Sequence, residues 1–270
     1  MNPAPSLRRR TPPRLPTALL TAAILLAAGL GEGSASEADA EQAAVRLRYS
    51  TGFDYSQGDF GLDEDSRLFF VPVGVTADYE RWRFRLVVPF LVSDGPSLIL
   101  EGDGVDPSTT LSDENSGMGE IAVSASYLVS PPIEGWPLLD LGLSISLPTR
   151  TKLELGTGGW AFAPRVELFE RYGRVTPYAA FGRKFFTVGS LDDRFFTSVG
   201  ASFEILDWLS FGSAYDWLEA TGGNTSDAHE ITPYLSISAP GGWSFSPYGL
   251  VGLSEGAPDF GVGFSLSLQR

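Results

Sequence analysis

The chain has 270 residues, of which 43% are hydrophobic and only 19% are charged, a low share of charge for a soluble protein. It carries 33 acidic and 19 basic residues, giving a formal net charge of −14, so we expect no nucleic-acid partner. The absence of cysteine excludes disulfides and thiol chemistry, and a single histidine argues against a His-built metal centre. We therefore expect no metal and no cofactor.

The N-terminus has the pattern of a secretory signal peptide. Four arginines between Arg8 and Arg14 form a basic start, an apolar stretch runs from Ala18 to Leu30, and small residues follow from Ser34 to Ser36. The apolar stretch is short for a membrane-spanning helix, although an uncleaved anchor is the alternative. The expected organisation is a cleaved signal peptide over 1–36, a short periplasmic segment over 37–44 and a β-barrel over 45–270.

The remaining chain alternates large apolar side chains with small or polar ones, a pattern typical of β-strands with two unlike faces. About 12 such strands can be placed, an even number as bacterial outer-membrane barrels require. The phase of the strand over 175–188 is ambiguous, and it is open which of Arg183 and Lys184 points inward. In chain order the predicted strands span 45–54, 69–79, 82–90, 121–129, 139–147, 160–168, 175–188, 195–205, 209–217, 231–239, 243–253 and 260–268.

The second face of these strands favours a membrane barrel over a soluble barrel or sandwich. It carries mostly Ser, Gly and Ala, as at Ser144, Ser198 and Gly200, whereas a water-facing surface normally carries many Lys and Glu. Aromatic residues gather at strand ends, as expected for anchors at the two lipid interfaces. The predicted fold is therefore all-β, a transmembrane antiparallel up-and-down β-barrel.

The connectors give this barrel a direction. Tight turns alternate with long acidic loops such as 93–116 and 219–228, and in outer-membrane barrels the short turns face the periplasm. Both termini should then be periplasmic, in the Gram-negative outer membrane, with outer-membrane lipids and lipopolysaccharide around the barrel. The last strand, with Asp259, Gly261, Phe264 and Leu266, resembles the signal read by the barrel assembly machinery, which we expect as a partner during biogenesis.

Charged residues within the strands are few and are the candidate lumen residues. Near the periplasmic end they should form a mixed ionic girdle, which either fills and stiffens the lumen or makes a constriction that orients a solute. This girdle comprises Arg46, Arg48, Arg83, Arg85, Asp140, Arg165, Glu167 and Glu204. An acidic upper half is predicted from Glu120, Asp216 and Glu230. The apolar run Leu98, Ile99 and Leu100 in the longest loop extends a strand, packs on other loops or folds inward as a gate.

Catalysis is not expected. Outer-membrane lipid hydrolases use a His and a Ser close together, but the only histidine is His229, and its neighbour on the same strand face is Ile231. A lipid-modifying enzyme is therefore only a distant alternative. A non-catalytic structural or surface-interaction barrel is the main rival to a channel.

Three short segments resemble a known family. Ser116-Gly117-Met118-Gly119-Glu120-Ile121, then Leu147-Pro148-Thr149, then Leu155-Gly156-Thr157-Gly158 are similar to segments of the outer-membrane transporter family named for the MetA pathway of phenol degradation. The resemblance implies a barrel that passes small, often aromatic, compounds across the outer membrane. With the strand pattern, it predicts a channel or transporter for passive passage of a small, aromatic or hydrophobic solute.

Overall fold

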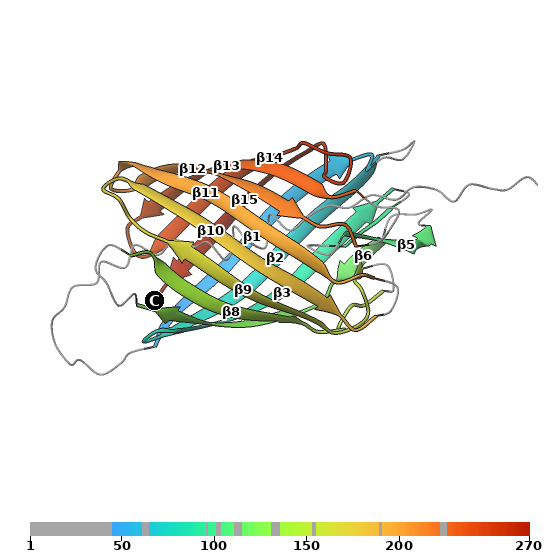
Figure 1. Ribbon diagram of the computed structural model, residues 1–270, viewed down its shortest axis with the longest axis horizontal. Coiled ribbons are helices and arrows are strands. Elements are labelled where there is room, and N and C mark those ends of the chain that lie inside the picture. The colour runs from blue at the N-terminus through green and yellow to red at the C-terminus, as the bar shows by residue number, and fades with distance from the viewer. Residues whose placement is uncertain are drawn as a thin grey trace, which may run out of the picture.

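The computed structural model describes residues 45–60, 65–95, 97–100, 104–110, 115–130, 136–152, 155–188, 191–221 and 226–270, with 97–100 and 104–110 described in their backbone only. The predicted signal peptide over 1–36 and the segment over 37–44 lie outside the described residues. The strands are β1 (Arg46–Gly58), β2 (Ser66–Tyr79), β3 (Trp82–Asp94), β4 (Ser97–Leu100), β5 (Gly104–Thr110), β6 (Asn115–Met118), β7 (Ala122–Val129), β8 (Leu138–Ser146), β9 (Ala161–Phe169), β10 (Val175–Phe186), β11 (Arg194–Leu206), β12 (Leu209–Leu218), β13 (Ala228–Ala239), β14 (Trp243–Gly252) and β15 (Phe260–Gln269) (Figure 1).

The strands form a closed antiparallel barrel. Sequence neighbours pair from β7 through β15, β1 pairs with both β15 and β2, and β2 pairs with β3. Both β6 and β7 pair with β3, β6 along one end and β7 along the other, so together they occupy one position in the barrel. The result is a barrel of 12 strands, which confirms the predicted fold and strand number.

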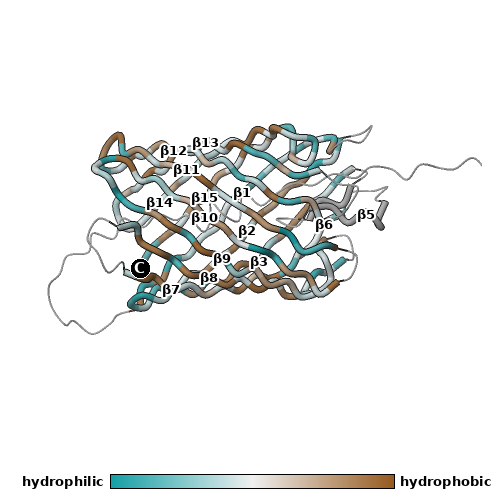
Figure 2. The backbone as a smooth tube through the Cα atoms, viewed as in Figure 1, coloured by the Kyte–Doolittle hydropathy of each residue, from teal (hydrophilic) through white to brown (hydrophobic). Residues whose placement is uncertain are grey.

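The two faces of each strand follow the predicted alternation. Outward positions carry large apolar side chains, such as Val73, which is 55% exposed, and Val199, which is 50% exposed. The phase of β10 is settled: Tyr178, Ala180 and Lys184 are buried on the lumen face, whereas Arg183 lies on the outer face. Figure 2 shows apolar and polar positions alternating along the tilted strands. Within the described residues, no helix is long and apolar enough to cross a membrane.

Aromatic side chains are exposed near both ends of the barrel, as anchors at two interfaces would be. Those near the short turns are Trp82, Trp136, Tyr172, Trp208 and Trp243, and those near the long loops include Phe90, Trp160 and Phe260. We call these two ends of the barrel the short-turn end and the long-loop end.

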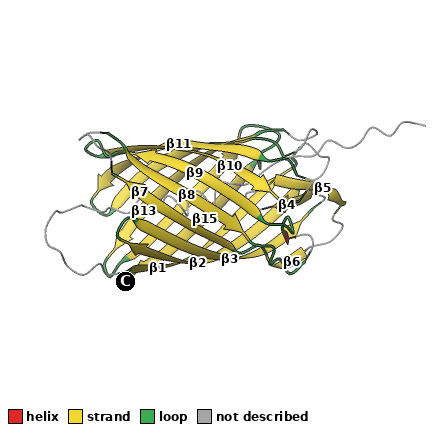
Figure 3. Cartoon of the chain, turned by 60° about the horizontal axis from the view of Figure 1, so that its bottom comes forward, coloured by secondary structure: helices red, strands yellow, loops and turns green. Residues whose placement is uncertain are grey.

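A small β-hairpin is separate from the sheet that forms the barrel wall. Strands β4 and β5 pair only with each other, at the long-loop end near β6 (Figures 1 and 3). The backbone of Leu98, Ile99 and Leu100 belongs to β4, a strand separate from the barrel strand β3 that precedes it. The side chains of these three residues lie outside the described part of the structure, so their role as a gate stays a prediction.

Candidate functional site in the barrel lumen

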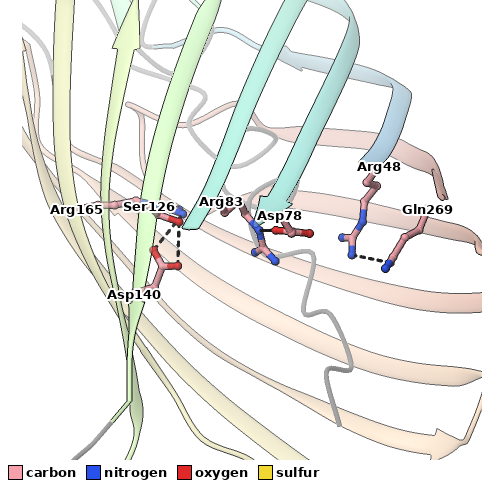
Figure 4. A network of polar contacts seen from close by, with 7 residues as sticks. All are labelled: Arg48, Asp78, Arg83, Ser126, Asp140, Arg165 and Gln269. Atoms are coloured by element: carbon pink, nitrogen blue, oxygen red, sulfur yellow. Dashed lines mark hydrogen bonds and ion pairs between the residues drawn. The ribbon is translucent and has the colours of Figure 1, made fainter. Parts of the chain in front are cut away.

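An ionic network lines the lumen near the short-turn end (Figure 4). Arg83 Nε lies 2.6 Å from Asp78 Oδ1, and the register places these two residues directly opposite each other on β2 and β3. Arg165 Nη2 lies 3.9 Å from Asp140 Oδ1, and Arg165 Nη1 lies 3.6 Å from Glu167 Oε2. The network thus balances arginines with carboxylates that would otherwise be buried without a counter-charge.

Two further contacts extend this lining. Ser126 Oγ donates a hydrogen bond of 3.0 Å to Asp140 Oδ2, and Arg48 Nη2 donates one of 3.2 Å to Gln269 Oε1. Every one of these contacts joins strands that are neighbours in the barrel or residues of the same strand. The contacts of these charged side chains therefore run along the wall of the barrel.

Three other predicted girdle residues, Arg46, Arg85 and Glu204, lie near the same end of the barrel. Arg46 lies opposite Asp78 in the register, at the start of β1, and Arg85 lies on β3 opposite Thr76, above Arg83. Glu204 forms an ion pair with Arg171 at the rim of the short-turn end. Asp78 was missed because it is the second-last residue of an apolar strand, next to a turn. The inward residues of β2 all have even residue numbers, and Asp78 continues this alternation, so the strand period could have identified it.

The long-loop half of the lumen is mixed in charge, which corrects the predicted acidic upper half. Asp216 and Glu230 are buried and lie directly opposite each other on β12 and β13. Two buried cations, Lys184 and Arg194, likewise lie opposite each other on β10 and β11. These cations were missed because the phase of the strand over 175–188 was ambiguous and Arg194 begins its strand.

An apolar cluster occupies the lumen at the long-loop end. Its strand members point inward from β2, β3 and β14, and two members, Phe60 and Leu155, come from loops. Phe60 has φ 51°, a left-handed conformation that costs a bulky residue about 1 kcal/mol. Burying its ring, which is only 2% exposed, offsets that cost with about 2 kcal/mol. The full cluster is Phe60, Leu68, Phe70, Leu91, Leu155 and Leu250.

Glu120 is the centre of a loop contact that we call the Glu120 latch. Its carboxylate accepts hydrogen bonds from Thr157 Oγ1, at 3.1 and 3.0 Å, and from the backbone N of Gly158, at 2.6 Å. Gly158 has φ 76°, which favours glycine at this turn. The latch fixes the loop that carries Leu155 into the apolar cluster. Glu120 thus holds a loop in place at the mouth of the lumen, and its predicted role in an acidic upper lumen stays a prediction.

Two threonines stabilise the same region. Thr149 Oγ1 accepts a hydrogen bond of 2.9 Å from the backbone N of Ile121, and Thr151 Oγ1 accepts one of 3.0 Å from that of Met118. These bonds satisfy backbone groups where the pairing with β3 is interrupted between β6 and β7. The three segments that carry the family resemblance therefore meet at one place, the mouth of the lumen at the long-loop end.

The histidine considered for catalysis, His229, is not among the residues of the lumen network. His229 Nδ1 lies 2.7 Å from the hydroxyl of Tyr215, whose ring is exposed on the outer face. Among the residues that the structure describes, no group of three or more His, Cys, Asp or Glu side chains could hold a metal ion. In the loop before β15, burial raises the pKa of Asp259, and the nearby Asp59 and Asp65 raise it further. The carboxylates at this mouth thus repel one another.

Solved structures of outer-membrane barrels share this fold. An outer membrane channel of Pseudomonas putida F1 superposes with a TM-score of 0.64 at 12% identity, covering 87% of this chain and 100% of that chain. The NanC porin gives 0.54 at 8% identity and the KdgM porin 0.50 at 11%, each covering 82% of this chain and 98% of the other. No protein-family model and no curated protein matches the sequence. The fold is shown, and the resemblance to the family named for the MetA pathway stays a prediction.

Proposed function

We propose that the protein is a passive channel in the Gram-negative outer membrane for a small solute. The support begins with the barrel surface: apolar side chains cover its outside, and aromatic residues are exposed near both ends. Such a surface is stable in lipid, and a closed barrel leaves no unpaired strand edge within the bilayer. The barrel would be inserted by the assembly machinery after export directed by the segment over 1–36.

The proposed orientation places the short turns and both chain termini of the barrel domain in the periplasm. The long-loop end, with its apolar cluster and the latch, would then face lipopolysaccharide and the exterior. A solute would meet the apolar cluster first and the ionic network second.

The apolar cluster is the observation that carries the proposal. Strand residues that face a water-filled lumen are usually polar, yet Leu68, Phe70, Leu91 and Leu250 face inward together at one level. A lumen within a 12-stranded barrel is narrow, so a solute there must contact this cluster. We propose that the solute is small and aromatic or hydrophobic, in line with the family resemblance of the latch segments.

The main rival is a structural barrel with no transport role. The ionic network is the observation that supports this rival, because ion pairs along the wall would stiffen it. A lipid-modifying enzyme is more distant, since Nδ1 of His229 lies beside the Tyr215 hydroxyl. Lipid hydrolysis by the purified protein that is lost in His229→Ala would support the enzyme.

Planar-bilayer conductance and liposome swelling test the channel. We expect flux of small solutes through the purified protein, and faster flux of an aromatic solute such as phenol in Phe60→Ala, which thins the apolar cluster. Phe203→Ala, on the outer face, is the matched control and should leave flux unchanged. No flux in the wild type and in Phe60→Ala would rule out the channel and favour the structural barrel.

A further inference from the structure

Three lumen tyrosines lie over glycines of the next strand. A Cβ atom added at Gly212 would lie 2.3 Å from Tyr234 Cζ, and one added at Gly200 would lie 2.4 Å from the Tyr178 hydroxyl oxygen. Both distances are shorter than any real side-chain contact, so each ring occupies space that only glycine leaves free. The register pairs are Tyr178 with Gly200, Tyr234 with Gly212 and Tyr248 with Gly263.

Tyr178 and Tyr234 approach each other across the two central strands. Tyr178 on β10 extends over β11, and Tyr234 on β13 extends over β12. The rings are only 5% and 9% exposed, respectively. The pair therefore forms a flat strip on the wall that spans four neighbouring strands.

We infer that Gly200 and Gly212 set the width of the lumen by letting this tyrosine pair lie flat. A tyrosine side chain is long relative to the radius of a narrow barrel. The free cross-section of the lumen therefore depends on whether the ring lies along the wall or projects from it. Arg165 lies over Gly142 in the same way, because a Cβ there would come within 2.8 Å of Arg165 Nε. The inference rests on the proposed channel, for which it identifies residues that determine which solutes fit.

Gly212→Ala is the sharpest test, because the three atoms nearest to the added methyl all belong to the Tyr234 side chain. The ring can move where backbone cannot, so the methyl should turn it away from the wall. We expect single-channel conductance to fall roughly twofold or more. Gly212→Ala should have no such effect when Tyr234 is already replaced by alanine. Gly249→Ala is the matched control, since its nearest neighbour, Gly261 O, is 3.8 Å from the added atom.

A second measurement does not depend on transport. A ring that leaves the wall becomes accessible, so nitration of Tyr234 by tetranitromethane, followed by peptide mass spectrometry, should increase severalfold in Gly212→Ala and stay unchanged in Gly249→Ala. Unchanged nitration in Gly212→Ala, or an equal loss of conductance with and without Tyr234, would overturn the inference. A wild-type protein without conductance but with increased nitration in Gly212→Ala would instead overturn the proposed channel and leave the tyrosine geometry supported.

Discussion

Removing the charge of the Glu120 latch should release the loop that carries Leu155. Glu120→Gln keeps the side-chain length but weakens the bonds from Thr157 Oγ1 and the Gly158 backbone N. A hydrogen bond to a charged group contributes about 1.5–3 kcal/mol, and these groups are partly exposed, so we take about 2 kcal/mol for the loss. Because about 1.4 kcal/mol is a factor of ten, the open population of the loop should increase roughly thirtyfold.

Because the chain contains no cysteine, a single introduced thiol can be used to measure opening of the loop. Leu155 is 4% exposed, so Leu155→Cys introduces a single thiol that reacts with a water-soluble maleimide only when the loop opens. Its labelling rate should increase roughly thirtyfold when Glu120→Gln is added. Glu219→Gln is the control, because the Glu219 carboxylate lies in another loop and accepts a hydrogen bond of 2.9 Å from the backbone N of Phe195 on β11. Equal labelling with and without Glu120→Gln would refute the latch.

Three further outcomes are expected. Arg165→Met leaves the carboxylates that it pairs with uncompensated, and should lower the free energy of unfolding in urea by about 2 kcal/mol; an unchanged midpoint would contradict the ionic network as a stabilising feature. Val199→Arg, on the outer face midway along β11, should make the free energy of folding into vesicles less favourable by about 2–4 kcal/mol, whereas Val45→Arg, before β1, should change it by at most about 1 kcal/mol. Equal changes for the two variants would argue against the membrane placement. Replacing Arg48 and Arg85 together with alanine should shift the reversal potential towards cation selectivity, and an unchanged potential would leave them a structural role.

The fold was predictable because a barrel strand repeats one physical constraint. Each outward residue meets lipid and each inward residue meets the lumen, so alternation fixes the phase of most strands from residue types alone. Strand β10 is the exception because Arg183 and Lys184 are adjacent, and the pattern gives no preference between two consecutive cations. The structure resolves it through the outer rings Phe185 and Phe195, each about 5 Å from the Arg183 guanidinium.

The mouth of the lumen was less predictable because loops have no period. Leu98 to Leu100 was the most apolar loop run in the sequence, yet the described cluster takes single residues, Phe60 and Leu155, from two other loops. The segments around Glu120, Thr149 and Leu155 were noticed for their resemblance to a family. The resemblance marks these residues but does not show that they contact one another. Their contacts are hydrogen bonds between chain positions that are 28 and 37 residues apart.

The direction of the charged side chains bears on the choice between a channel and a structural barrel. Ion pairs that fill a lumen would join residues on opposite walls, so their contacts would cross the barrel axis. Here Arg83 pairs with the adjacent strand, and Arg165 lies over Gly142 to reach carboxylates on its own and the next strand. The tyrosines over Gly200 and Gly212 follow the same rule. A barrel that serves only as a rigid structure has no need of glycine beneath these long lumen side chains, whereas a barrel that passes a solute gains free cross-section at each such position.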